Sequence, residues 1–377
     1  MKINLIGQRN LLGFGTHFAG FCDQFKKLTL PDGVLAEHLL SDEASAERLV
    51  QAAQPTDINI WFYAFARPAT IKTQGRNIVW AVFEHDRLSP GHIQQLQRAD
   101  LVWTPSVWAK GILESQGVSP AKLDVIAEGV DTETFHPFTR LAPAPPKPGI
   151  FRFLMIGKFE ERKGYTQLLQ AFAKAFGGDP KVELLIKGDY FIFGQERKGS
   201  ALLDFVRGFG VPNVKLLSGA MTRQELFLIY SMADAFVFPS RAEGWGLPLL
   251  EAMATGLPAI STNYSGHTEF LKTVEGYFSP IAHRLVPITD RDYQRIVLRR
   301  EGDLGHWAEA DIDDLAQKMR DMVARYDEWR QKGLAASRIL RAKFTWANAV
   351  EAAVESMAGH GLWPRLHWSP PAGLTIR

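Results

Sequence analysis

Cysteine is almost absent from this chain, since Cys22 is the only one in 377 residues. An internal disulfide framework and a cysteine-based zinc site are therefore excluded, which fits a protein of a reducing compartment. We interpret Cys22 as a small core residue on a helix, because an isolated cysteine commonly packs as a hydrophobic side chain.

Long hydrophobic runs are absent as well, because no apolar stretch of about 18 residues occurs in the sequence. We expect neither a membrane span nor a signal peptide, since the chain begins MKINLIG and then turns polar. Charge of one sign is not in excess either: 43 basic and 41 acidic residues give a formal net charge of +2. We therefore expect a cytoplasmic protein without a general nucleic-acid-binding surface.

Short apolar runs alternate with amphipathic stretches over most of the length, which is typical of α/β folds with parallel sheets. The chain is too long for one compact core, so we expect two doubly wound domains. Nearly continuous apolar composition predicts buried strands at KINLIG, INIWFY, NIVWAVF, DLVWTP and LDVIAEG, and then at FRFLMIG, VELLIKG, NVKLLSG, AFVFPS and PAIST.

Prolines mark the boundary between the two halves, with four of them within six residues of FTRLAPAPPKPGI. We therefore predict an N-terminal domain at 1–140, a proline-rich linker at 141–150 and a C-terminal domain at 151–340. The tail, 341–377, is expected to pack back toward the N-terminal domain. Residues 284–300 look irregular and arginine-rich, whereas 312–341 have the pattern of amphipathic helix.

The first candidate site is the turn after strand KINLIG, where Gly13 and Gly15 precede a predicted helix that Thr16 can cap. Glycines at such a turn let backbone amides approach an anion at the helix N-terminus. The full GxGxxG pattern is absent, because the last interval, to Gly20, has the wrong length. A plain turn therefore stays open as the alternative.

The second candidate site is GKFEERKG, residues 157–164, between strand FRFLMI and the helix that starts near Tyr165. Lys158 and Lys163 place two cations in a loop at a strand end, an arrangement that suits a diphosphate. The alternative is a solvated charged loop, which is the usual interpretation of any single lysine.

The third candidate site is EGWGLPLLEAMATGLP, which follows strand AFVFPS. Glu243 lies in the loop, and Pro248 suits the first residue of a helix that Gly256 ends. The amides of Trp245, Gly246 and Leu247 are then unpaired at the helix start. Glu251 is expected in the first helical turn, and a carboxylate there can accept from two vicinal sugar hydroxyls.

These motifs resemble the retaining GT-B glycosyltransferases of the family 4, or glycosyl transferases group 1, type, which includes bacterial polysaccharide mannosyl- and glucosyltransferases. The resemblance covers nearly the whole chain and is most specific at Glu243 and Glu251, which seven residues separate. The segments GKFEERKG, VIAEGVDTETFHP and NYSGHTEF also match. The resemblance implies two Rossmann-like doubly wound domains that face an interdomain cleft.

The resemblance also implies roles for the candidate residues. Glu251 would bind the ribose of a nucleotide sugar, whose diphosphate would meet Lys158, Lys163 and the turn with Gly13 and Gly15. The transferred sugar would be held by Glu243, Gly244, Trp245, Gly246 and Leu247. Family members commonly carry arginine at the position of Lys158, so this chain presents a point charge instead of a bidentate fork.

The fourth candidate site follows strand NIVWAVF, which places Glu84, His85 and Asp86 at the end of the N-terminal sheet. His85 could bond the sugar or orient the acceptor hydroxyl, as a histidine near this place does in relatives, and a structural trio is the alternative. We interpret three further histidines as structural: His17, His136 and His267. Two DxD strings, at 290–292 and 311–313, lie outside the strand-end loops, so we predict neither a metal nor another cofactor.

We therefore predict a metal-independent hexosyltransferase that uses a nucleotide-diphosphate sugar and retains anomeric configuration, with mannose preferred. The acceptor is a glycan or a lipid-linked glycan, and Lys26, Lys27 and Arg67 suggest peripheral contact with an anionic membrane surface. Solvated lysines beside core aromatics are the alternative to that contact. Two other functions stay open: a nucleotide-sugar epimerase or hydrolase, and a non-catalytic nucleotide-sugar-binding protein.

Overall fold

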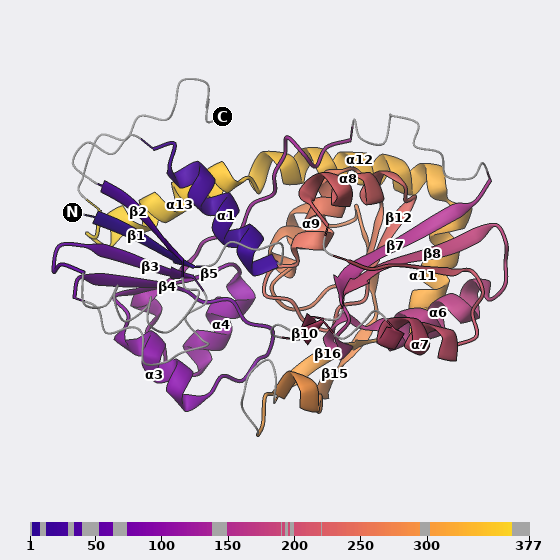
Figure 1. Ribbon diagram of the computed structural model, residues 1–377, viewed down its shortest axis with the longest axis horizontal. Coiled ribbons are helices and arrows are strands. Elements are labelled where there is room, and N and C mark those ends of the chain that lie inside the picture. The colour runs from indigo at the N-terminus through magenta and orange to yellow at the C-terminus, as the bar shows by residue number, and fades with distance from the viewer. Residues whose placement is uncertain are drawn as a thin grey trace.

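The computed structural model describes residues 2–7, 13–28, 34–39, 53–62, 74–137, 149–189, 191–192, 195–196, 200–219, 221–294 and 302–363. Most of the predicted linker lies outside the described residues. Arg67 lies outside them as well. The described chain forms two halves, each built around a twisted sheet (Figure 1).

Among the described residues, the N-terminal sheet has the strand order β2-β1-β3-β4-β5-β6, and all neighbouring strands are parallel. The strands are Lys2–Gly7 (β1), Val34–Leu39 (β2), Ile58–Phe62 (β3), Arg76–Trp80 (β4), Leu101–Thr104 (β5) and Leu123–Val125 (β6). Every apolar run predicted as a strand in this half forms one. The sequence analysis missed β2, whose apolar run Glu37 and His38 interrupt, and β4 ends before residues 81–83.

The helices of this half are α1 (Gly13–Phe25), α3 (Pro90–Arg98) and α4 (Val107–Ser115), with a 3₁₀ turn at Pro120–Lys122 (η3). Ser89 and Ser106 cap α3 and α4, because each side chain accepts a hydrogen bond from an amide of the first turn. The prediction that Thr16 caps a helix is wrong, since α1 begins three residues earlier and Thr16 lies within it.

The C-terminal sheet has the order β11-β8-β7-β12-β13-β14 among the described residues, again with parallel neighbours. Its strands are Phe151–Lys158 (β7), Val182–Asp189 (β8), Val214–Leu217 (β11), Ala235–Phe238 (β12), Ala259–Thr262 (β13) and Ser279–Ile281 (β14). All the predicted strands form, and the short β14 was not predicted. The chain winds outward from β7 and then returns to β12, so the topological switch point lies between these two strands.

The longer helices of this half are α6 (Tyr165–Phe176), α7 (Ser200–Gly208), α8 (Arg223–Ser231), α9 (Leu247–Ala254), α11 (Ile312–Ala324) and α12 (Tyr326–Lys343). Shorter turns are η4 (Glu161–Lys163), α10 (Thr268–Leu271) and η5 (Lys272–Val274). Alternate residues of β7 enter different cores: Phe153 and Met155 pack with side chains of α6 and α11, Leu154 and Ile156 with side chains of α9 and α12. Helices thus cover both faces of the sheet, as the doubly wound prediction requires.

A hairpin extends this half beyond its parallel sheet. Strands β15 (His283–Pro287) and β16 (His306–Ala310) pair in antiparallel register, and a second small ribbon joins Phe191–Ile192 (β9) to Gln195–Glu196 (β10). The prediction of irregular structure from residue 284 onward is therefore wrong for residues 284–287. Four of the five side chains of β15 are exposed, so an analysis that searched for buried apolar runs missed this strand.

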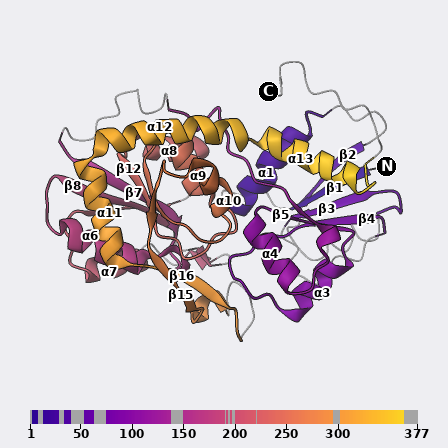
Figure 2. The same cartoon turned by 180° about the vertical axis from the view of Figure 1, so that it is seen from behind.

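The end of the chain returns to the N-terminal half through α12 and α13 (Trp346–Gly359), as Figure 2 shows from behind. The amide of Val130 donates to Phe344 O at 2.9 Å, and Trp346 stacks on His17 with ring centroids 5.7 Å apart. Gly20 allows this packing, because a Cβ there would lie 2.3 Å from Trp346 Cε2. Helix α13 thereby becomes part of the N-terminal core.

Candidate functional site

The loop after β7 carries the second candidate site to the topological switch point. Lys158 is the last residue of β7, and η4 then places Arg162 and Lys163 inward, where both are buried. Gly164 ends this turn with φ +73°, and a Cβ there would lie 2.2 Å from Pro239 O in the loop after β12. The two loops at the switch point therefore pack directly on each other.

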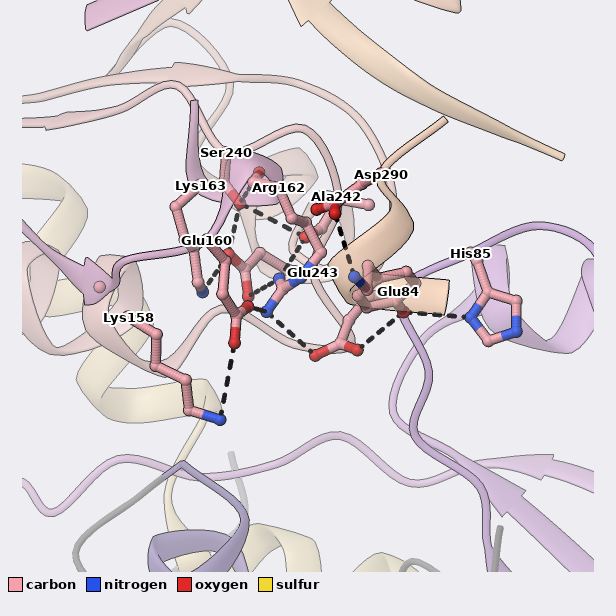
Figure 3. Close-up of polar contacts among 12 residues, drawn as sticks. Glu84, His85, Lys158, Glu160, Arg162, Lys163, Ser240, Ala242, Glu243 and Asp290 are labelled. Carbon is pink, nitrogen blue, oxygen red and sulfur yellow. Dashed lines mark hydrogen bonds and ion pairs between the residues drawn. The ribbon is translucent and has the colours of Figure 1, made fainter. Parts of the chain in front are cut away.

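The loop after β12 brings Glu243 to the same place (Figure 3). Its Oε1 lies 2.6 Å from Lys163 Nζ and accepts a hydrogen bond from Ser240 Oγ, and its Oε2 lies 3.2 Å from Arg162 Nη1. Since a carboxylate has about four lone-pair positions, one acceptor position on Oε2 stays available to a hydroxyl group.

Arg162 lies at the centre of this cluster. Its guanidinium faces three carboxylates, at 3.0 Å from Glu160 Oε2, 3.2 Å from Glu243 Oε2 and 3.4 Å from Glu84 Oε1, and it donates to Ala242 O at 2.7 Å. Glu84 belongs to the N-terminal half, so this ion pair joins the two halves. The sequence analysis missed Arg162, although its position beside Lys163 in GKFEERKG was the available signal.

Burial and charge act in opposite directions on these groups. Burial by itself raises the pKa of Glu243, but Lys163 and Arg162, with hydrogen bonds from Lys163 and Ser240, lower it to about 2. Burial lowers the pKa of Lys163, against the attraction of Glu243. For Arg162, burial is outweighed by Glu84, Glu243 and Glu160, which raise its pKa well above its ordinary value. Glu243 and Arg162 are therefore both charged at neutral pH.

Lys158 approaches the N-terminal half at the start of α1. Its Nζ lies 5.6 Å from the ring centre of Phe14, which stands between Gly13 and Gly15 in the first turn of that helix. The Lys158 ammonium is also 4.0 Å from Glu160 Oε1, and its side chain is 30% exposed. The first two candidate sites thus face each other, and an anion between them would meet both a cation and the positive end of a helix.

The turn from Gly244 to Leu247 leads into α9 with Gly246 at φ +93°. Within the described residues, the amides of Trp245, Gly246 and Leu247 donate no hydrogen bond, as the start of a helix allows. This turn is closely packed on both sides: a Cβ on Gly244 would lie 2.3 Å from the side-chain atom Val82 Cγ1, and one on Gly266 would lie 1.9 Å from the backbone atom Gly244 O. Gly266 therefore cannot be replaced without moving the backbone of the turn, whereas a side chain at Gly244 would first displace Val82.

The segment NYSGHTEF, residues 263–270, forms hydrogen bonds with the backbone of Glu243. Ser265 Oγ accepts from the Glu243 amide at 2.8 Å, and the Gly266 amide donates to Glu243 O at 2.9 Å. Ser265 adopts φ +68°, a conformation that costs free energy in a residue other than glycine. The two hydrogen bonds fix the backbone of Glu243 and accompany the unfavourable conformation of Ser265.

Glu251 lies deeper, on the buried face of α9, where Tyr230 OH donates to its Oε2 at 2.9 Å. It is the fifth residue of the helix, so its predicted place in the first turn is wrong by one turn; Pro248 is the second residue instead of the first. Burial raises the pKa of Glu251 to about 7, although the Tyr230 hydrogen bond opposes the shift.

Glu251 should make the stability of the protein depend on pH. Its carboxyl has a pKa of about 7 in the folded state, against an ordinary value of 4.5, so between these pH values the folded state retains a proton that the unfolded state has lost. Stability from this group is present below pH 4.5 and is lost as pH rises through 7. We expect Glu251→Gln to abolish this loss, which amounts to about 3 kcal/mol.

Urea unfolding of both proteins from pH 4.5 to 8 measures this difference, with the exposed Glu355→Gln as the matched control. The wild type should lose free energy of unfolding relative to Glu251→Gln as pH rises, and Glu355→Gln should follow the wild type. Parallel curves for Glu251→Gln and the wild type would contradict the assignment.

His85 lies where the N-terminal half meets the hairpin (Figure 3). Its Nδ1 is 3.2 Å from Tyr293 OH, and the same hydroxyl donates to Glu84 Oε2 at 3.3 Å. Trp307 of β16 donates from Nε1 to Glu84 O at 2.6 Å, and the amide of His306 donates to Asp86 Oδ1 at 2.8 Å. The trio 84–86 therefore joins the two halves, a contact that no local sequence pattern predicts.

The histidines interpreted as structural and the aspartates of the two DxD strings form contacts that stabilise the fold. His17 is buried 3.4 Å from Glu128, with burial lowering its pKa to about 3, and His267 bonds Thr262 O at 2.7 Å. Asp311 caps α11, and Asp290 accepts from the amides of Asp292 and Tyr293. Among the described residues, no group of three or more histidine, cysteine or acidic side chains is arranged to hold a metal ion.

No helix of the described chain is both long and apolar enough to cross a membrane. Of the residues predicted to touch a membrane surface, Lys26 and Lys27 are exposed just after α1, whereas Arg67 is outside the described residues.

A family model and several curated proteins that match this chain are all described as glycosyltransferases. Residues 143–281 match the family model described as Glycosyl transferases group 1. A stretch of 185 residues is 30% identical to D-inositol 3-phosphate glycosyltransferase of Nocardiopsis dassonvillei, covering 47% of this chain and 43% of that protein. A stretch of 220 residues is 27% identical to GDP-mannose:cellobiosyl-diphosphopolyprenol alpha-mannosyltransferase of Xanthomonas campestris, covering 58% and 53% respectively. The chain spans about half the length of the curated relatives it matches.

Solved structures resemble nearly the whole chain. Sucrose-phosphate synthase of Thermosynechococcus elongatus has a TM-score of 0.71 at 16% identity, over 95% of this chain and 98% of that one. HepE of Anabaena, in complex with UDP and glucose, has a TM-score of 0.70 at 15% identity, over 95% and 100%. At such identities the likeness shows the fold alone, and it confirms the GT-B architecture predicted from the sequence.

Proposed function

The chain belongs, through residues 143–281, to the glycosyl transferases group 1 family, and on that premise we propose that it transfers a hexose from a nucleotide-diphosphate sugar to a glycan or lipid-linked acceptor. The observation that carries the proposal is the meeting of Lys158, Lys163 and Glu243 at the switch point, opposite the start of α1. Open α/β sheets bind their ligands at this point.

The cations act on the leaving group in this proposal. Breaking the anomeric C–O bond leaves negative charge on the diphosphate, so positive groups already in place lower the barrier. Lys163 Nζ uses one of its three donors on Glu243, at 2.6 Å, and two stay available to phosphate oxygens. Lys158 and the first-turn amides of α1, at Gly13 and Gly15, meet the diphosphate from the opposite side.

The carboxylates hold hydroxyl groups. Glu243 has an open acceptor position on Oε2 beside Arg162, which suits a hydroxyl of the transferred sugar, and the amides of Gly244, Trp245, Gly246 and Leu247 lie next in the chain. Glu251 binds the ribose, and its elevated pKa means that the acceptor form predominates only above about pH 7. His85 bonds the sugar or the acceptor hydroxyl.

We propose that the transfer needs no metal ion, because Lys158 and Lys163 already supply positive charge to the diphosphate. We therefore expect kcat to be unchanged after treatment with EDTA, measured as nucleoside diphosphate released in the presence of acceptor. Loss of turnover that Mg²⁺ restores would contradict this part of the proposal.

We favour mannose as the transferred hexose. We also propose that the reaction retains the anomeric configuration of the donor sugar. One relative is named a GDP-mannose alpha-mannosyltransferase, which supports the choice of mannose. The HepE complex contains UDP and glucose, so UDP-glucose is the donor to compare. NMR of the product decides the course, because an inverted anomeric centre would remove the retaining assignment.

Turnover with and without an acceptor tests the function as a whole. A thermal-shift panel of UDP, GDP, ADP and their sugars first identifies the donor, since a ligand that binds the folded state raises its apparent stability. Consumption of that donor only with an acceptor supports transfer. Consumption without an acceptor supports a hydrolase or epimerase, and binding without consumption supports a non-catalytic protein.

A further inference from the structure

Arg241 lies in the loop after β12, two residues before Glu243, and its side chain is buried. Its guanidinium forms an ion pair with Glu161 of η4, and its Nη2 lies 3.8 Å from Glu309 Oε2 of β16. Its Cζ also lies 5.4 Å from the ring centre of Trp307, at which distance a cation and an aromatic ring attract each other. Arg241 therefore joins the loop that carries Glu243 both to η4 and to the hairpin.

The backbone of Arg241 contacts η4 as well. Its amide donates to Arg162 O at 2.7 Å, so η4 is held at two adjacent residues, by the carbonyl group of Arg162 and by the carboxylate of Glu161. The next residue in this three-residue turn is Lys163, whose side chain is buried beside Glu243. Because two fixed points leave a short turn little freedom, Arg241 helps to determine where Lys163 Nζ lies.

The hairpin holds the backbone of Arg241 too. The amide of Ala308 donates to Arg241 O at 2.9 Å, and Trp307, which is fully buried, donates from Nε1 to Glu84 O at 2.6 Å in the N-terminal half. Strand β16 lies beyond residues 143–281, which match the family model. The surroundings of Arg241 thus include a part of the chain beyond the matched segment, and that part also contacts the N-terminal half.

The charge of Arg241 can be removed without leaving a fully buried carboxylate unpaired. The Glu161 side chain is 51% exposed, so water can replace its partner, and Glu309 keeps Arg284, whose Nη2 lies 2.7 Å from its Oε1. Arg241→Met keeps an unbranched side chain against Trp307 and both backbone hydrogen bonds. We therefore expect this variant to fold, which thermal unfolding checks.

We propose that Arg241 is a positioning residue, whose guanidinium clamps η4 to the hairpin and thereby holds Lys163 Nζ where it stabilises the leaving diphosphate. The role of Lys163 in this inference rests on the proposed function, whereas the clamp does not. Arg241 acts without touching the substrate, because its buried guanidinium contacts Glu161, Glu309 and Trp307 instead. The hairpin thereby contributes to transfer through the orientation of η4.

Hydrogen exchange of the whole protein, followed by mass spectrometry, tests the clamp without any substrate. The amides of Lys163 and Gly164 donate to carbonyl groups of the same turn, each at 3.0 Å, so peptides that span 158–164 report on η4. Arg241→Met should speed exchange there about tenfold, the size of a lost hydrogen bond to a charged group. Peptides of α13 should exchange as in the wild type.

Arg284→Met is the matched control for this experiment. Among the described residues this exposed arginine pairs with the same carboxylate, Glu309, and not with η4. Its exchange at residues 158–164 should match that of the wild type. Equal exchange of Arg241→Met and Arg284→Met at this turn would overturn the clamp.

Kinetics test whether Arg241 acts on the reaction. If the proposed transfer is correct, Arg241→Met should lower kcat by about 10- to 100-fold with little change in the KM of the donor, since a displacement of about 1 Å costs up to about 10²-fold. Arg241→Lys, which keeps a cation beside Glu161, should recover part of this loss. Arg284→Met should behave as the wild type, and an undiminished kcat in folded Arg241→Met would contradict the positioning role.

A double-mutant cycle separates positioning from a purely structural role. In a Lys163→Gln background, Arg241→Met should lower kcat no further, because the group that Arg241 positions is already gone. Losses that multiply would overturn the action through Lys163. Failure of the wild type to consume any donor would instead count against the proposed function, and the exchange experiment would still test the clamp.

Discussion

Replacing both Lys158 and Lys163 with alanine should lower kcat/KM by about 10⁴-fold, because removing one preplaced donor to a developing anion costs about 10² to 10³. The two lysines reach the switch point from the end of β7 and from η4, and neither can take over the position of the other. Affinity for the intact donor should fall less than kcat, since the charge on the leaving group grows in the transition state.

The Lys163 replacement needs its own control for folding. In Lys163→Ala the buried Glu243 keeps Arg162 and Ser240 but loses its contact at 2.6 Å, which costs about 1 to 3 kcal/mol. Lys163→Gln keeps a donor for Glu243 and removes the charge, so it should be folded like the wild type and nearly as inactive as alanine. The exposed Lys174→Ala should behave as the wild type, because its partner Asp313 is also exposed.

Initial rates of nucleoside diphosphate release measure these variants, with thermal unfolding recorded on the same samples. A folded Lys158→Ala and Lys163→Gln double variant with undiminished turnover would show that the diphosphate does not depend on these cations.

Arg162→Ala should destabilise the protein by about 3 to 5 kcal/mol and abolish turnover, because it leaves buried carboxylates without their shared partner. Glu243 would keep Lys163, but Glu84 would lose the ion pair at 3.4 Å that joins the two halves. Arg162 also donates to Ala242 O at 2.7 Å, so the loop that carries Glu243 loses an anchor. Both the fold and the site depend on this guanidinium.

Arg162→Lys should not restore the protein, since one ammonium cannot reach three carboxylates and a carbonyl oxygen at once. Arg325→Ala is the matched control, because this exposed arginine pairs with Asp321 and Glu328 within its own part of the chain. Urea unfolding should give little loss of stability for Arg325→Ala, because exposed ion pairs contribute little. Equal stability of Arg162→Ala and Arg325→Ala would contradict a central role for Arg162.

The fold could be predicted from the sequence because buried parallel strands are nearly continuous apolar runs. Strands such as β7 and β12 have that composition and were found. The same criterion misses β2, with Glu37 and His38, and β15, where most side chains are exposed. Neither strand has the continuous apolar sequence by which buried strands were recognised.

The candidate site could be predicted where its residues follow strand ends in a motif. Lys163 and Glu243 are eighty residues apart in the sequence, yet their side chains touch because β7 and β12 are neighbours at the switch point. The contacts of Glu84 and Tyr293 could not be predicted, because they depend on how the halves and the hairpin pack together. No local pattern encodes that packing.

A crystal structure with the nucleoside diphosphate of the preferred donor tests the central claim most directly. The account predicts that the β-phosphate lies within hydrogen-bond distance of Lys158 and Lys163 and near the first turn of α1, with the ribose at Glu251. A diphosphate bound away from the two lysines would contradict it.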